Sequence, residues 1–171
     1  MGPVGSGKSY IANILAKKLR AVHIRTDDIR VELRAQGKTY DAAPRIAADL
    51  REQALAEAKS VIADFDAVLP RRKRELAKAA KKHGALFFLV AINAPEKVIL
   101  ARLRKKRYTK KELFQNAKEA IRVYFIRKST REKGLRATPN FAINNGKPLE
   151  PQIERIIKKI IRHSERIEES D

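Results

Sequence analysis

The sequence has no cysteine and no apolar stretch long enough to cross a membrane. Without cysteine there is neither a disulfide framework nor a thiolate metal site, and we expect a cytoplasmic protein. The longest apolar run, residues 85–92, is far shorter than the roughly 20 residues that a transmembrane helix needs. No secretory signal precedes the first motif, so no membrane partner is expected.

Acidic residues are also scarce. There are 20 Asp and Glu against 39 Lys and Arg, which gives a formal net charge of +19. Residues 97–136 have 15 basic and 3 acidic side chains, and residues 71–82 have 7 basic and 1 acidic. The positive electrostatic potential of such segments attracts polyanions and phosphorylated ligands. Nucleic acid is therefore a candidate partner, although an enzyme that acts on a small nucleotide also needs a basic active face.

The remaining composition is that of a folded protein. Of the 171 residues, 43% are hydrophobic and 35% are charged, which is typical of a globular domain with its own core. No internal repeat, low-complexity tract or domain boundary interrupts the chain. We therefore expect one domain over residues 1–171.

Residues 2–9, Gly-Pro-Val-Gly-Ser-Gly-Lys-Ser, match the pattern G-x-x-x-x-G-K-[ST] of a phosphate-binding loop (P-loop). The glycines let backbone N–H groups approach phosphate oxygens, and the helix after the loop points its positive end at the same anion. Lys8 is expected to reach the β- and γ-phosphates, and the Ser9 hydroxyl to ligate Mg²⁺. The pattern thus predicts ATP and Mg²⁺ as cofactors. The predicted nucleotide-binding residues of the loop are Gly2, Gly5, Ser6, Gly7, Lys8 and Ser9.

A P-loop normally comes after a buried strand that is central in its sheet, but only Met1 stands before this one. The sequence therefore predicts a fold whose first strand is missing from the chain. Either the start lies too far downstream or the chain is truncated.

Helical periodicity alternates with short β-prone runs, which is typical of an α/β domain with a parallel sheet. Helices are expected over residues 9–20, 27–36, 44–58, 70–83, 95–107, 109–131 and 153–167. Strands are expected over residues 21–25, 60–63, 85–92 and 141–143. The run 85–92 is continuously apolar, as in a strand that is buried on both faces. Thr26 is the predicted cap of the second helix.

The segment Thr26-Asp27-Asp28-Ile29-Arg30 comes directly after a predicted strand, where open α/β sheets place their ligands. A carboxylate near the γ-phosphate orients and deprotonates an attacking hydroxyl, so Asp27 is the predicted general base. Arg30 lies one helical turn later and is predicted to hold the acceptor. Without a phosphate site, the same residues would be an ordinary acidic helix N-terminus.

Asp64 comes directly after the apolar residues 61–63, as the Asp of a Walker-B strand does. This pattern predicts Asp64 as the second metal ligand beside Ser9, with Asp66 as the alternative. The three histidines, at positions 23, 83 and 163, have no metal-ligand spacing, and we expect them to be surface or capping residues.

A basic run occupies residues 102–108. Arginines from such a run can clamp the phosphoryl group during transfer. Arg102 and Arg107 are the predicted catalytic members, and most of the other basic residues are expected to be solvated.

These motifs together resemble the small AAA-type P-loop kinase family. It includes zeta-toxin-like kinases, gluconate-kinase-like enzymes and the kinase domain of polynucleotide kinases. The resemblance covers nearly the whole chain and rests on residues 2–9, 26–30, 61–64 and 93–103. It implies a P-loop nucleotide-kinase-like, three-layer fold, with a five-stranded parallel sheet, helices on both faces and a helical lid at about 102–138.

The resemblance also implies roles for individual residues. Asp27 corresponds to the general base, Arg30 to the acceptor ligand and Arg102 to a lid arginine. The turn at 144–146 corresponds to a segment near the adenine, which makes Asn145 a predicted nucleotide-binding residue.

The sequence thus predicts an ATP-dependent phosphotransferase that moves the γ-phosphate to a hydroxyl group of a small metabolite or nucleoside. A 5′-hydroxyl polynucleotide kinase is the alternative, which the few aromatic residues, expected to be buried, disfavour. A basic nucleotide-binding ATPase or switch without an acceptor is the third candidate. Asp27 and Arg30 argue against it.

Overall fold

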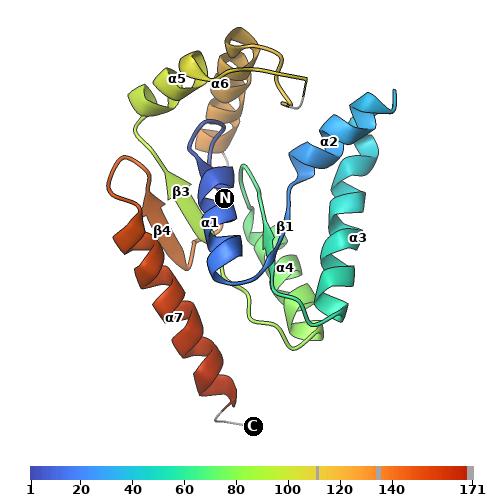
Figure 1. Ribbon diagram of the computed structural model, residues 1–171, viewed down its shortest axis with the longest axis vertical. Helices are drawn as coiled ribbons and strands as arrows, with labels where there is room; N and C mark the ends of the chain where they lie inside the picture. The colour runs from blue at the N-terminus through green and yellow to red at the C-terminus, as the bar shows by residue number, and fades with distance from the viewer. Residues whose placement is uncertain (111, 134–135, 169–171) are drawn as a thin grey trace.

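The computed structural model describes residues 1–110, 112–133 and 136–168, and it shows short parallel strands between longer helices (Figure 1). The strands are β1 (Val22–Ile24), β2 (Val61–Ala63), β3 (Val90–Asn93) and β4 (Phe141–Asn144). The helices are α1 (Lys8–Lys18), α2 (Thr26–Ala35), α3 (Ala43–Ala56), α4 (Pro70–Lys82), α5 (Glu96–Lys105), α6 (Ala117–Lys133) and α7 (Glu150–Glu168), with a 3₁₀ turn η1 at Tyr40–Ala42. This alternation confirms the predicted α/β class.

The strands form two parallel pairs, β1 with β2 and β3 with β4. The five-stranded sheet implied by the resemblance is therefore divided within the described residues. The backbone of Met1 and Gly2 lies between the pairs. The Ile92 N–H donates to the Met1 carbonyl at 2.7 Å, and the Gly2 N–H donates to the Phe65 carbonyl at 3.0 Å. A strand that led into the P-loop would run through this gap.

Helices cover the strands from both sides, as predicted (Figure 1). Helices α1 and α3 both pack on the β1–β2 pair, and α7 packs along β4. Helices α5 and α6 pack against each other above the P-loop. Of this pair, α6 and the last four residues of α5 fall within the segment 102–138 that was predicted as a lid. Within the described residues, no helix combines the length and the apolar character that crossing a membrane requires.

The largest apolar cluster lies between α1, the β3–β4 pair and α7. Its buried members are Ile11, Leu15, Ile92, Ile143, Ile153 and Ile156. Burying one such side chain stabilises the fold by roughly 1.5–3 kcal/mol. A second cluster packs Val4 of the P-loop against Ile99 and Leu103 of α5 and Tyr124 of α6. The two clusters hold the P-loop between the strands below it and the helical pair above it.

Several predicted boundaries were wrong, among them the starts of α7, at Glu150 rather than residue 153, of β3 and of α6. Strand β3 begins at Val90 rather than at residue 85, because its partner β4 begins only at Phe141. Helix α6 begins at Ala117 rather than at residue 109. Asn116 ends the preceding turn by accepting the Glu119 N–H on its side chain at 2.9 Å, which is a helix cap.

The start of α2 was also predicted wrongly. Thr26 is the first helical residue and not the cap, which is Arg25 without a side-chain capping bond. The carbonyl of Arg25 accepts the N–H groups of Asp28 and Ile29, so the helix starts one residue earlier than predicted.

Candidate active site

The P-loop has the backbone conformation that its glycines allow. Gly5 and Gly7 have φ values of 77° and 85°, in the left-handed region. A Cβ on Gly7 would lie 2.1 Å from Nδ2 of Asn145, and one on Gly2 would lie 2.6 Å from the Ile92 carbonyl oxygen. Larger residues at these positions would therefore collide with the β3–β4 pair and the turn after it.

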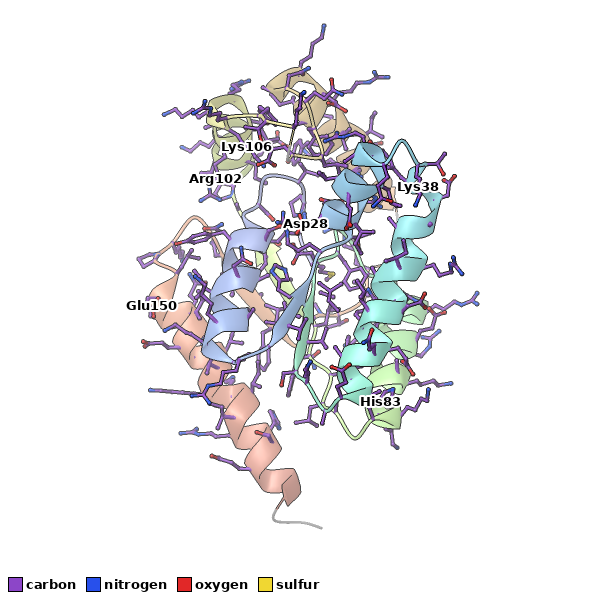
Figure 2. The ribbon with its side chains drawn as sticks, turned by 45° about the vertical axis from the view of Figure 1, so that its right-hand side comes forward. Asp28, Lys38, His83, Arg102, Lys106 and Glu150 are labelled. Carbon is purple, nitrogen blue, oxygen red and sulfur yellow. The ribbon has the colours of Figure 1, made fainter. Side chains whose placement is uncertain are left out.

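Asn145 and Arg102 support the P-loop from outside. The buried Asn145 side chain lies just beyond β4 and donates from Nδ2 to the Ser6 carbonyl at 2.6 Å. Arg102, labelled on α5 in Figure 2, donates to the Asn145 carbonyl at 3.0 Å and more weakly to the Ser6 carbonyl at 3.4 Å. Both predicted site residues thus contact the loop. Arg107 lies beyond the end of α5 and is exposed.

A cleft of about 520 Å³ opens beside Lys8. Its lining includes Lys8 from α1, Asp27 and Arg30 from α2, and Asp64 just after β2. The structure thereby brings together four predicted site residues that are distant in the sequence, whereas Arg107 is not part of this lining.

A second, larger groove of about 680 Å³ runs along α5. Its lining consists of Lys97, Val98, Ala101, Arg102, Lys105 and Lys106. These described side chains offer neither a carboxylate nor a hydroxyl group for acid–base chemistry. The candidate active site is therefore the smaller cleft.

Ser9 and Asp64, the two predicted metal ligands, are in direct contact. The Ser9 hydroxyl donates to Oδ2 of Asp64 at 2.6 Å. Ser9 is in the first turn of α1, and Asp64 is at the carboxyl end of β2. A hydroxyl and one carboxylate suit Mg²⁺, which binds proteins through few oxygen ligands and completes its shell with water and phosphate. The residues present therefore fit this ion.

Asp64 is largely shielded from solvent, with 11% of its side chain exposed. Burial raises the pKa of its carboxyl group, but the hydrogen bonds from His23 and Ser9 and the charge of Lys8 outweigh it, so the net pKa lies below the ordinary value. The carboxylate is therefore ionised at neutral pH, as a metal ligand must be.

Asp66, the alternative metal ligand, has a different position. Its Oδ1 lies 2.8 Å from Nζ of Lys8, and its carboxylate also forms an ion pair with Arg127 of α6. Asp64 rather than Asp66 therefore contacts Ser9. Arg127 was not predicted from the sequence, although it shares the inward face of α6 with Ala120 and Tyr124 at the spacing i, i+4, i+7.

Asp27 and Arg30 meet as the sequence predicted. Nη1 of Arg30 donates to Oδ1 of Asp27 at 2.7 Å, and both side chains line the cleft. The neighbouring Asp28, labelled in Figure 2, pairs with Arg25 at 3.0 Å and does not belong to the cleft lining. The helical turn of about 100° per residue explains why adjacent carboxylates separate.

His23 is the second residue that sequence reasoning missed, since it was expected to be a surface or capping residue. Only 10% of its side chain is exposed. Its Nε2 donates to Oδ1 of Asp64 at 3.1 Å, and its Nδ1 lies 2.7 Å from Oδ1 of Asn13. No sequence pattern links positions 23 and 64. The parallel pairing of β1 with β2 brings them together.

The chain is similar to known proteins in its family pattern and in its fold. A family model described as an AAA domain matches residues 1–125. No curated protein is significantly similar to the chain. Among solved structures, the gluconokinase of Sinorhizobium meliloti 1021 has a TM-score of 0.61 and 18% identity, and the match covers 100% of this chain and 94% of that chain.

Two further kinases have similar structures. The APS kinase CysC of Mycobacterium tuberculosis, solved with AMPPNP and APS, has a TM-score of 0.58, 16% identity and 92% coverage of both chains. A sugar kinase from Janibacter sp. HTCC2649 has a TM-score of 0.56 and 18% identity, with 92% of this chain and 90% of that chain covered. At these identities the likeness shows the fold. The family model spans residues 1–125, which include the P-loop and the cleft residues from Lys8 to Arg72. The chain therefore belongs to the AAA domain family and has the fold of the small AAA-type P-loop kinases.

Proposed function

We propose that the protein is an ATP-dependent phosphotransferase that moves the γ-phosphate of ATP to a hydroxyl group of a small-molecule acceptor. The observation that carries this proposal is the cleft lined jointly by Lys8, Asp64, Asp27 and Arg30. The similar structures named gluconokinase, APS kinase and sugar kinase support a small acceptor.

The P-loop amides and Lys8 would bind the phosphates of ATP, and Asn145 and Arg102 would lie on the nucleotide side. Ser9 and Asp64 would hold Mg²⁺, which would supply positive charge to neutralise the phosphates of ATP. Asp66 forms ion pairs with both Lys8 and Arg127. We infer that phosphate competes with Asp66 for both of them.

Asp27 would accept the proton of the acceptor hydroxyl, and Arg30 would position the acceptor. The acceptor oxygen forms a bond to the γ-phosphorus while the bond from that phosphorus to the bridging oxygen of ADP breaks. Arg127 reaches the cleft directly, so it joins Arg102 and Arg107 as a proposed arginine for charge stabilisation in transfer.

A 5′-hydroxyl polynucleotide kinase is the second candidate, and one observation favours it. The expectation that aromatic side chains are buried was wrong for Tyr10, Tyr40 and Phe125, which are 63%, 41% and 46% exposed. Exposed aromatic rings on a basic protein are suited to base stacking. None of the three lines the cleft, which is why the small acceptor is preferred.

An acceptor screen with γ-labelled ATP tests the proposal. It should contain sugars, sugar acids, nucleosides and a 5′-hydroxyl oligonucleotide. We expect label on a small acceptor. Label on the oligonucleotide alone would establish the second candidate. ATP hydrolysis without a labelled acceptor would instead favour an ATPase or switch.

A further inference from the structure

The cleft has more positive than negative charge. Its basic side chains are Lys8, Arg25, Arg30, Arg51, Arg72 and Arg127. Its acidic side chains are Asp27, Asp64 and Asp66. The lining therefore has three more basic than acidic side chains, which favours an anionic ligand.

The cations close to the P-loop and α2 are already paired. Arg30 pairs with Asp27, Lys8 and Arg127 share Asp66, and Arg25 pairs with Asp28. The other two cations of the lining, Arg51 and Arg72, come from α3 and α4. Within the described residues, none of the three lining carboxylates pairs with either of them, and the partner of Arg72 is Glu75, which is not part of the lining. The wall formed by α3 and α4 therefore carries cations without a lining carboxylate beside them.

Arg51 is half-buried and held in a defined orientation. Its guanidinium carbon lies 5.6 Å from the centroid of the Phe65 ring, so the aromatic face covers one side of the cation. Within the described part of the chain, Arg51 has no carboxylate partner. Burial and the neighbouring Arg72 both lower its pKa. A guanidinium that has a fixed orientation and no carboxylate beside it is suited to bind an anion.

Arg72 lies in the first turn of α4, and its carboxylate partner, Glu75 at 3.0 Å, is on the same exposed helix face. That first turn has no acidic residue, and residues 71–74 are all basic. Cations at a helix N-terminus oppose the helix macrodipole. An anion between Arg51 and Arg72 would relieve both this opposition and the repulsion between the two arginines.

We propose that the acceptor carries, besides the hydroxyl group that is phosphorylated, an oxyanion group that Arg51 and Arg72 bind. Carboxylate, phosphate and sulfate share the required chemistry, because the planar guanidinium pairs with two oxygens of each. The inference rests on the proposed function, since it takes the transfer to occur between Lys8 and Asp27. It adds that the acceptor is anionic.

Matched acceptor pairs test the charge requirement and its chemical source. Gluconate is compared with glucose, glycerol 3-phosphate with glycerol, and adenosine 5′-phosphosulfate with adenosine, using the full chain, ATP and Mg²⁺. We expect the anionic member of the preferred pair to have at least about a tenfold higher kcat/KM. The pair with the highest ratio identifies carboxylate, phosphate or sulfate as the group.

Arg51→Gln and Arg72→Gln should each raise KM for the anionic acceptor about tenfold or more and leave kcat nearly unchanged. The matched control is Arg74→Gln, which removes the same charge from an exposed position of α4 outside the cleft. Arg51→Lys keeps the charge but loses the planar fork, so it should recover only part of the affinity. If Arg51→Gln fails to fold, Arg72→Gln decides the result, because its side chain is 44% exposed.

A binding measurement separates this inference from the proposed function. With the P-loop saturated by ADP and Mg²⁺, inorganic sulfate is titrated and the melting temperature is monitored. The wild type and Arg74→Gln should be stabilised, whereas Arg72→Gln should not. Equal stabilisation of wild type and Arg72→Gln, or equal use of charged and uncharged acceptors, would overturn the inference. If anions bind as expected but no acceptor is phosphorylated, the kinase proposal fails and the anion site stands.

Discussion

The β1–β2 pair and the β3–β4 pair differ in the residues found at the carboxyl ends of their strands. The ends of β1 and β2 lead into Asp27, Arg30 and Asp64, whose charged side chains line the cleft. The end of β4 leads into Asn145, which supports the P-loop backbone. The β3–β4 pair also carries the larger apolar cluster with α1 and α7.

The β1–β2 pair therefore positions the charged side chains of the cleft, whereas the β3–β4 pair supports the P-loop. Charges that must meet a ligand cannot be surrounded by apolar side chains, because burying an unpaired charge is costly. A loop that must hold its shape benefits from an apolar core beneath it and from satisfied carbonyl groups. Substitutions on the first pair should therefore change turnover, and substitutions on the second should change stability.

The largest effect is expected for Lys8→Ala, at the junction of the two pairs. Turnover should fall by about 10³-fold or more, because the main side-chain cation at the transferring phosphate is lost. The fold should persist, since Asp66 keeps its ion pair with Arg127. Turnover and thermal melting are measured together. If the folded variant had wild-type turnover, the P-loop would have no part in catalysis.

Asp27→Asn should lower turnover by about 10²–10⁴-fold while nucleotide affinity changes little. The reason is that the variant keeps the shape of the proposed general base but loses its charge. Asp28→Asn is the matched control, because Asp28 does not line the cleft and pairs with Arg25 rather than Arg30. The reverse result, an inactive Asp28→Asn and an active Asp27→Asn, would reassign the base.

Ile153→Ala tests the supporting pair. Ile153 is fully buried beneath β4, so its truncation should cost about 2–5 kcal/mol of unfolding free energy. Turnover per folded molecule should stay near wild type. Ile161→Ala on the same helix is the control, because Ile161 is 44% exposed. Denaturant unfolding measures the stability of both variants. If Ile153→Ala lowered turnover without lowering stability, the β3–β4 pair would not have the supporting role assigned to it.

A β-prone apolar extension before Met1 should join the two pairs. It would continue the backbone bonds that Met1 makes with β3, and it would remove a buried ammonium group whose pKa burial lowers to about 6. A gain of about 1 kcal/mol corresponds to a melting temperature about 2–4 °C higher. A Gly/Ser extension of equal length is the control. Equal melting of the two would show that the gap accepts no strand.

The smallest effect is expected for His23→Ala, through the pKa of Asp64. Because the folded-state pKa of Asp64 is depressed, its bonds stabilise the fold above the unfolded pKa and are lost as the pH falls through the folded one. Removing the His23 bond should raise the folded pKa toward the unfolded one, so the variant should be less stable near neutral pH and lose less stability as the pH falls. Melting between about pH 3 and 6 measures this. His163 is exposed on α7, so His163→Ala is the control and should leave the dependence of stability on pH unchanged in this range.

The sequence by itself determined the parts of the site whose geometry is local. The P-loop at residues 2–9 and the pair Asp27 and Arg30 need only glycine φ values and one helical turn. Asp64 was predicted because a carboxylate directly after an apolar strand lies at the sheet edge. The α/β class was predictable from the alternation of helical and strand periods.

Only the tertiary structure decided which distant side chains meet these residues. His23 contacts Asp64 through the pairing of β1 with β2, and Arg127 reaches Asp66 from a helix whose start the sequence misplaced. The stacking of Arg51 on Phe65 depends on how α3 packs beside β2. Such contacts depend on strand register and on helix packing, which are properties of the whole core rather than of a local run of residues.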